Sequence, residues 1–170
     1  YHEIVGYFLD AISNVYGRDK DVSVTAFKEV WTNEIVPAFL NTFSESKAII
    51  VVRDPRAVIA SNNVTKAKYP LFFLTRQWRK SVFIAKYLEK QFPEKTMILR
   101  YEDLLQYPET VIQKICHFCN IPFEVKLLDS SNYLDGDNKP WKQNTSYKEQ
   151  SKRNINKDSI NKWTQILEKP

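Results

Sequence analysis

The chain has 170 residues, of which 43% are hydrophobic and 14% aromatic, a composition that suits one folded domain with a buried core and excludes a disordered chain. Its net charge of +5 suits an anionic ligand, but the lysines and arginines form no dense basic run, which argues against nucleic acid as a partner. No stretch of about 18 apolar residues is present, so no membrane-spanning helix is predicted, and the first residues lack the pattern of a signal peptide.

Three elements are expected in the first part of the chain. Apolar residues at helical spacing predict a helix over Tyr1–Tyr16, ending where Gly17 stands. A short strand is predicted over Val22–Phe27, directly before Lys28. A helix over Asn33–Phe43 is then expected to lead into a strongly apolar strand.

The segment Ala48–Ser61 carries the most information about function. Its four consecutive β-branched residues predict a strand buried on both faces, as at the centre of a parallel sheet. Asp54 is a favourable N-cap and Pro55 suits a first helical position, so a helix should begin immediately after the strand. Arg53 then lies at the carboxyl end of a strand beside a helix N-terminus, where α/β sheets bind ligands and anions are favoured. From the residues alone, Arg53 either binds an anion or pairs with a nearby carboxylate.

The motif Arg-Asp-Pro-Arg-x-Val that starts at Arg53, followed by Ser61, resembles the 3′-phosphate-binding motif of sulfotransferases, which use 3′-phosphoadenosine 5′-phosphosulfate as sulfuryl donor. The resemblance implies that Arg53 and Ser61 hold the 3′-phosphate, because a guanidinium pairs bidentately with phosphate oxygens and a hydroxyl adds to the shell. A lysine often precedes this motif in the family. Lys28 is therefore either a catalytic residue, stabilising charge on the sulfuryl group or its leaving phosphate, or a solvated surface lysine.

A long helix is expected after the break at Tyr69-Pro70. Its clearest part is Arg76–Leu88, where an aromatic-rich stripe should face the core. Arg79 and Lys80 lie on the other face of this helix. That face is either solvated or turned toward a negatively charged acceptor.

A second resemblance to sulfotransferases follows. A strand predicted over Thr96–Arg100, then Tyr-Glu-Asp-Leu, a proline, an amphipathic helix over Pro108–Cys119 and a closing Ile-Pro are similar to the family's pattern after its next parallel strand. The resemblance implies that Tyr101 contacts the adenine end of the nucleotide, since its ring can pack on a base. Glu102 and Asp103 are expected to cap the turn and pair with arginines rather than to act in catalysis.

Two cysteines, Cys116 and Cys119, are predicted to share one face of that helix. Their apolar neighbours favour a place in the core. A metal site would need further ligands, and the sequence context of a thioredoxin-like redox pair is missing.

The last part of the chain combines a long polar loop over Glu124–Lys142 with a helix over Ile155–Leu167. Sulfotransferases have a comparable tail, with a serine-rich and basic loop over the nucleotide before a helix that carries Lys-Trp or Arg-Trp. By this resemblance, Ser146, Arg153 and Lys162 are candidate contacts to the 3′-phosphate.

The sequence therefore predicts an α/β fold, a parallel sheet flanked by helices, of the sulfotransferase kind within the P-loop nucleoside-triphosphatase-like architecture. Residues 1–170 are expected to form a single sulfotransferase domain that corresponds to the C-terminal part of the family's domain. None of the three glycines lies in a glycine-rich phosphate loop, so the N-terminal portion with the 5′-phosphosulfate loop and the usual base is expected to be absent. The isolated chain should accordingly be a poor catalyst.

The resemblance implies sulfuryl transfer from 3′-phosphoadenosine 5′-phosphosulfate (PAPS) to an acceptor hydroxyl of a carbohydrate or a protein tyrosine, with no metal. The motif at Arg53 is closest to those of Golgi carbohydrate and protein-tyrosine sulfotransferases. A Golgi-lumenal protein, held by a membrane anchor outside this chain, is therefore expected in preference to a cytoplasmic one. Two alternatives are a catalytically inactive nucleotide- or glycan-binding module and a nucleotide kinase of related fold.

Overall fold

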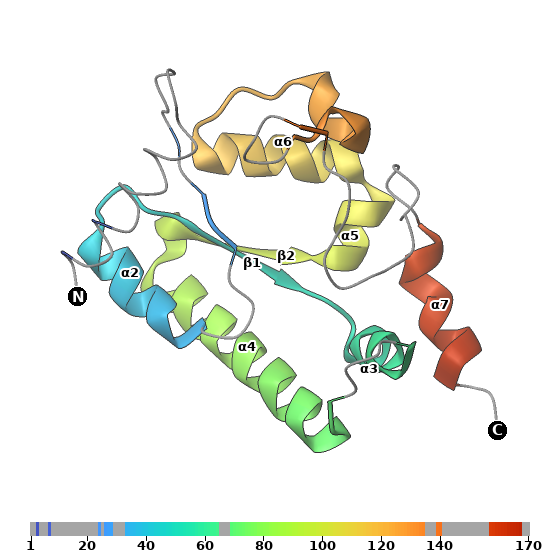
Figure 1. Cartoon of the computed structure of the whole chain (residues 1–170). Helices are drawn as coiled ribbons and strands as arrows, with labels where there is room; N and C mark the ends of the chain where they lie inside the picture. Colours follow the sequence, from blue (N-terminus) through green and yellow to red (C-terminus); the bar gives the residue numbers. More distant parts are fainter. Residues whose placement is uncertain are drawn as a thin grey trace.

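The computed structural model of the chain describes residues 3, 7, 24, 26–28, 33–64, 69–134, 139–140 and 157–167. In these ranges the protein is an α/β structure in which parallel strands lie between layers of helices (Figure 1). The elements in chain order are η1 (Asn33–Ile35), α2 (Val36–Thr42), β1 (Ala48–Val52), α3 (Pro55–Val64), α4 (Leu71–Gln91), η2 (Pro93–Lys95), β2 (Thr96–Arg100), α5 (Tyr101–Gln106), α6 (Pro108–Cys119), η3 (Val125–Leu128), η4 (Ser130–Asn132) and α7 (Asp158–Leu167).

Strands β1 and β2 pair in parallel, and the connection between them runs through α3 and α4. Their register brings both strands to an end at the same level, because the last pair joins Val52 to Arg100. Arg53 and Tyr101, which follow the two strands, therefore start from the same edge of the sheet. This edge is the carboxyl end, where parallel α/β sheets bind their ligands.

The core lies between the sheet and the helices on each side. Figure 1 shows α2 and α4 on one side of the sheet and α6 on the other. Helix α4 turns Leu74, Ala85 and Leu88 inward, three residues whose spacing keeps them on one side of a 3.6-residue helix. The other buried apolar residues of the described part are Leu40, Ala57, Ala60, Leu105, Val111 and Cys116.

Most predicted elements are confirmed. The strand at Thr96–Arg100 and the helix at Pro108–Cys119 have their predicted bounds. The long helix extends beyond its predicted core in both directions, since α4 begins directly after Pro70 and ends at Gln91. The helix expected over Asn33–Phe43 is divided into η1 and α2 and ends one residue earlier. The last helix begins at Asp158 rather than at Ile155.

Two strand predictions are wrong. β1 is not buried on both faces, because Ile49 and Val51 are 37% and 54% exposed while their neighbours turn inward. A run of β-branched residues reports strand propensity but not how many faces are covered. The strand expected over Val22–Phe27 is not found at its described residues, which are irregular. Phe27 instead packs edge-on against Phe39 of α2, with the ring centroids 5.6 Å apart.

Three further segments refine the expected picture. The Tyr-Glu-Asp-Leu segment, expected as a turn, is the short helix α5. The polar loop after α6 contains η3, η4 and an antiparallel bridge between Leu134 and Pro140. Most of the predicted N-terminal helix lies outside the described residues, although Glu3 and Tyr7 are helical. None of the helices in the described ranges is long and apolar enough to span a membrane.

The core packing gives a direct stability prediction. Leu88 of α4 is fully buried, so Leu88→Ala should lower the free energy of unfolding by about 2–5 kcal/mol through lost burial and a residual cavity. Urea denaturation followed by circular dichroism measures this change. The matched control is Leu71→Ala at the exposed start of the same helix, which should cost far less. Equal losses in the two variants would contradict this account of the core.

Candidate functional site

The turn between β1 and α3 begins the helix through Asp54. The Asp54 carboxylate accepts a 2.8 Å hydrogen bond from the backbone N–H of Arg56, and the Asp54 carbonyl accepts one from Val58 at 3.0 Å. The predicted N-cap is thereby confirmed. The same carboxylate pairs with the Arg56 guanidinium at 2.7 Å, and this hydrogen-bonded ion pair lowers the pKa of Asp54.

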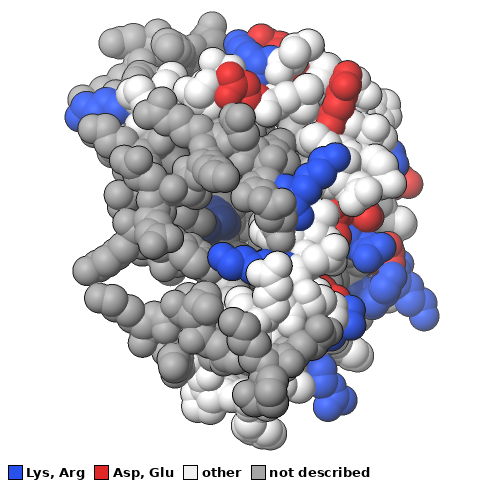
Figure 2. Space-filling model, turned by 90° about the vertical axis from the view of Figure 1, so that its right-hand side faces the viewer, with Lys and Arg blue, Asp and Glu red and all other residues white. Residues whose placement is uncertain are grey.

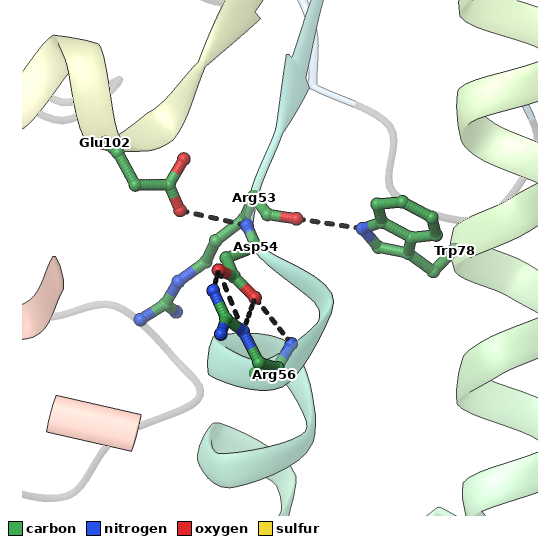
Figure 3. A network of polar contacts seen from close by, with 5 residues as sticks. All are labelled: Arg53, Asp54, Arg56, Trp78 and Glu102. Carbon is green, nitrogen blue, oxygen red and sulfur yellow. Dashed lines mark hydrogen bonds and ion pairs between the residues drawn. The ribbon is translucent and has the colours of Figure 1, made fainter. Parts of the chain in front are cut away.

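Two side chains from other elements hold this turn in place. The indole N–H of Trp78 in α4 donates a 2.8 Å hydrogen bond to the carbonyl of Arg53, and the carboxylate of Glu102 in α5 accepts one of 2.9 Å from the backbone N–H of Asp54 (Figure 3). The sequence predicts that Glu102 caps the turn after β2, but in the structure it holds the turn between β1 and α3 instead. Trp78 belongs to the aromatic-rich stripe that is predicted to face the core. A buried indole N–H needs a hydrogen-bond acceptor, and this requirement could have predicted that Trp78 also contacts the backbone.

The guanidinium of Arg53 has no carboxylate partner among the described residues. Asp54 pairs with Arg56, Glu102 accepts from a backbone amide, and no ion pair in the described part of the chain joins either carboxylate to Arg53 (Figure 3). Its Nε is buried without a hydrogen-bond partner. Among the described residues, one terminal nitrogen donates a long hydrogen bond of 3.3 Å to the carbonyl of Ser159. Within the described residues, Arg53 is therefore not paired with a carboxylate.

Tyr101 and helix α7 complete the surroundings of Arg53. The guanidinium lies over the Tyr101 ring, 4.7 Å from its centroid, and the Tyr101 hydroxyl is 3.4 Å from that of Ser159. Helix α7 packs on α3, where the Trp163 ring lies 3.9 Å from the Arg56 guanidinium. The sequence predicts a helix in this region, but it does not identify Ser159.

A small cavity of about 250 Å³ opens at the carboxyl ends of the two strands. Its lining includes Arg53, Trp78, Arg100 and Glu102. Sites for small molecules usually measure about 300–1,000 Å³, so this cavity can take an anionic group but not a whole nucleotide.

Comparison with known proteins identifies the family. Residues 3–125 match the model of the "Sulfotransferase family". The chain belongs to the sulfotransferase family. A Caenorhabditis elegans relative, named "Putative protein-tyrosine sulfotransferase", is 24% identical over 144 residues, which cover 80% of this chain and 54% of the relative. The chain thus spans about half the length of the curated relative it matches.

Solved structures agree at the level of the fold. The sulfotransferase domain from the curacin biosynthetic pathway is 22% identical with a TM-score of 0.64, and the match covers 97% of this chain and 61% of that one. The sulfotransferase domain from the Synechococcus PCC 7002 olefin synthase is 20% identical with a TM-score of 0.67, covering 97% and 57%. The predicted α/β fold of the P-loop-like sulfotransferase kind is confirmed.

The other site residues expected for a sulfotransferase lie in different surroundings. Ser61 is half-buried in the second turn of α3. Lys28 and Lys162 are exposed, and no described contact joins either of them to Arg53. Ser146 and Arg153 lie outside the described residues. The structure therefore brings Arg53 and Tyr101 together, and it adds Ser159 to them.

The described basic side chains do not gather into one surface patch on the side of the molecule that carries α7 (Figure 2). Figure 2 shows Lys and Arg in several separate groups on this face, with Asp and Glu among them. Within the described ranges, no group of His, Cys, Asp and Glu could hold a metal ion. Cys116 is a buried thiol, as expected for a structural residue, and burial raises the pKa of the neighbouring Cys119.

The Asp54–Arg56 pair makes stability depend on pH. Asp54→Asn keeps a capping oxygen but removes the charge. Because the folded-state pKa of Asp54 is lowered, the contribution of the pair is fully present above the ordinary carboxyl pKa of about 3.9 and is lost as the pH falls through the lowered pKa. The wild-type chain should therefore be the more stable of the two at pH 7, and the difference should vanish in acid.

Urea unfolding at a series of pH values measures this difference. The control is Glu45→Gln, an exposed residue without an ion pair in the described part of the chain, which should give no comparable trend. If the difference in the free energy of unfolding between wild type and Asp54→Asn stays constant down to acid pH, the charge of Asp54 contributes nothing to stability.

Proposed function

We propose that the Arg53 turn binds the 3′-phosphate of a 3′-phosphoadenosine nucleotide, and that the protein takes part in sulfuryl transfer from PAPS to an acceptor hydroxyl. The observation that carries this proposal is the state of Arg53, a cation whose buried Nε lacks a partner while both neighbouring carboxylates are engaged elsewhere. A buried donor without an acceptor is costly, and an anionic ligand supplies the missing acceptor.

The residues present fit a phosphate group. Tyr101 covers one face of the Arg53 guanidinium, and the terminal N–H groups, which lie in the plane of that group, are the ones that can pair with phosphate oxygens. The long hydrogen bond to the Ser159 carbonyl is weaker than a charge-assisted bond to phosphate. The N-terminus of α3 adds its partial positive charge beside Arg53.

The remaining roles follow from the family. The donor nucleotide supplies an activated sulfuryl group, and this chain contributes binding and orientation. Ser61 adds a hydroxyl to the phosphate shell, and Tyr101 packs against the adenine end. Lys28, Ser146, Arg153 and Lys162 are proposed on resemblance alone. Lys28 would stabilise charge on the sulfuryl group or its leaving phosphate, and the other three would contact the 3′-phosphate.

The acceptor and the compartment are also part of the proposal. The curated relative is named as a protein-tyrosine sulfotransferase, which supports a hydroxyl acceptor of that kind, with a carbohydrate hydroxyl as the other option. The form of the motif at Arg53 supports a Golgi-lumenal protein.

The binding step can be tested on the 170-residue chain. Isothermal titration with adenosine 3′,5′-bisphosphate should give tighter binding than AMP or ATP. Arg53→Ala should weaken it at least about tenfold, because the charge-assisted bonds are lost. The affinity of Arg53→Lys should lie between those of the wild type and Arg53→Ala, since lysine keeps the charge but lacks the planar guanidinium.

The matched control for this titration is Arg79→Ala, an exposed arginine on α4, which should leave the affinity unchanged. Circular dichroism verifies that each variant is folded. Absence of binding by the folded wild-type chain would overturn the proposal, and a preference for ATP would favour a nucleotide kinase. Binding without any sulfuryl transfer by the full-length protein would identify an inactive binding module.

Helix α7 should contribute to the same affinity. Trp163→Ala removes the ring that lies against Arg56, so α7 and its Ser159 should be held less firmly beside Arg53 and Tyr101. We expect bisphosphate binding to weaken by a smaller factor than in Arg53→Ala, about threefold to tenfold. Amide exchange in α7 should become faster, whereas the exposed control Gln165→Ala should change neither measurement. Unchanged affinity in Trp163→Ala would exclude α7 from the site.

A further inference from the structure

The outward face of α4 carries two exposed phenylalanines on one line. Phe72 and Phe83 are 78% and 73% exposed. They are eleven residues apart, which on an α-helix is about three turns, so they lie on the same side with about 16 Å between them along the axis. Single exposed apolar residues are ordinary, but two aligned large rings on one helix face are a feature to be explained.

Two arginines lie on the same line between the rings. Arg76 and Arg79 follow Phe72 by four and seven residues, and both are exposed. Neither forms an ion pair or hydrogen bond with any residue that the structure describes. Helix α4 as a whole carries five basic residues and one acidic residue, so no excess of negative charge on the helix neutralises them. The four residues Phe72, Arg76, Arg79 and Phe83 are called the Phe–Arg stripe below.

The Phe–Arg stripe is separate from the Arg53 turn. It lies on the opposite side of α4 from the buried stripe that contains Leu74, Ala85 and Leu88. Trp78, the α4 residue that donates to the Arg53 carbonyl, is not a stripe residue, although it also lines the groove described next. A shallow groove runs along the outward face, and all four stripe residues line it. Figure 1 shows α4 as the outer layer of its side of the molecule.

We propose that the Phe–Arg stripe docks an acidic amphipathic helix of a partner protein. Acidic side chains of that helix pair with Arg76 and Arg79, and apolar side chains pack on Phe72 and Phe83. Spacing of four, three and four residues is that of a helix–helix seam with a period of 3.5 residues. The spacing is the same in both directions, so the seam accepts a parallel or an antiparallel partner. This inference does not rest on the proposed function.

The width of the Phe–Arg stripe favours a helix over other anionic partners. A membrane surface is bound by a broad apolar face, whereas here basic residues interrupt the exposed apolar ones. Arg76, Arg79, Lys86 and Lys90 lie among Phe72, Phe83 and Tyr87 on this face of α4. A sulfated polysaccharide would pair with the arginines but would leave both rings in water. A second copy of the chain does not fit either, because two copies would bring arginine against arginine.

A synthetic helix tests the proposal. The probe is a fluorescein-labelled, alanine-rich peptide with leucine, glutamate, glutamate and leucine at positions i, i+4, i+7 and i+11. Fluorescence anisotropy should detect binding to the 170-residue chain that weakens with salt. The double variant Arg76→Glu/Arg79→Glu should weaken it at least about tenfold, and Phe72→Ser/Phe83→Ser should also weaken it. All four residues are exposed, so the variants should fold.

Matched controls separate the seam from general electrostatics. Lys114→Glu on the exposed side of α6 and Arg53→Ala should leave peptide binding unchanged, as should adenosine 3′,5′-bisphosphate. A peptide with serine in place of both leucines should bind at least about tenfold more weakly. Equal binding of the serine peptide, or no loss in the Arg76→Glu/Arg79→Glu variant, would overturn the proposal. The proposal would also be overturned if heparin or phosphatidylserine vesicles bound to the same four residues more tightly than the peptide does.

Discussion

The site depends on a pair of hydrogen bonds that fix a single turn of backbone. The carbonyl of Arg53 is held by the Trp78 indole, and the next amide, that of Asp54, is held by Glu102. These two groups face opposite directions along one peptide bond, so the turn is anchored to α4 on one side and to α5 on the other. A backbone anchored in this way has little freedom to rotate, and the direction in which the Arg53 side chain leaves it is fixed with it.

The distribution of charge around this turn keeps one arginine available. Of the two arginines in the motif, Arg56 forms an ion pair with the Asp54 carboxylate. Its exposed guanidinium also lies against the Trp163 ring. Glu102 is occupied by a backbone amide. Both described carboxylates that contact the turn, Asp54 and Glu102, therefore help to hold the structure, and no described carboxylate pairs with Arg53.

Much of this arrangement could be predicted from local sequence. Asp54 and Pro55 determine where α3 begins through backbone chemistry, and the parallel pairing of the two strands follows from their helical connection. The exposure of Val51 could not be predicted, because it depends on which elements cover the strand rather than on the strand itself. The contact between Arg53 and Ser159 was equally out of reach, because it joins residues 106 positions apart and depends on how α7 packs on α3.

That long separation also affects how the site forms as the chain folds. Arg53, Tyr101 and Ser159 come from three distant segments, and their contacts close some of the largest loops in the chain. Closing a large loop costs more chain entropy than forming a local turn, and contacts between distant residues generally form more slowly than local ones. The helices and the paired strands can therefore be in place before the Arg53 site is complete. During synthesis the site remains incomplete until the ten residues of α7 have emerged, so it is assembled only after its scaffold.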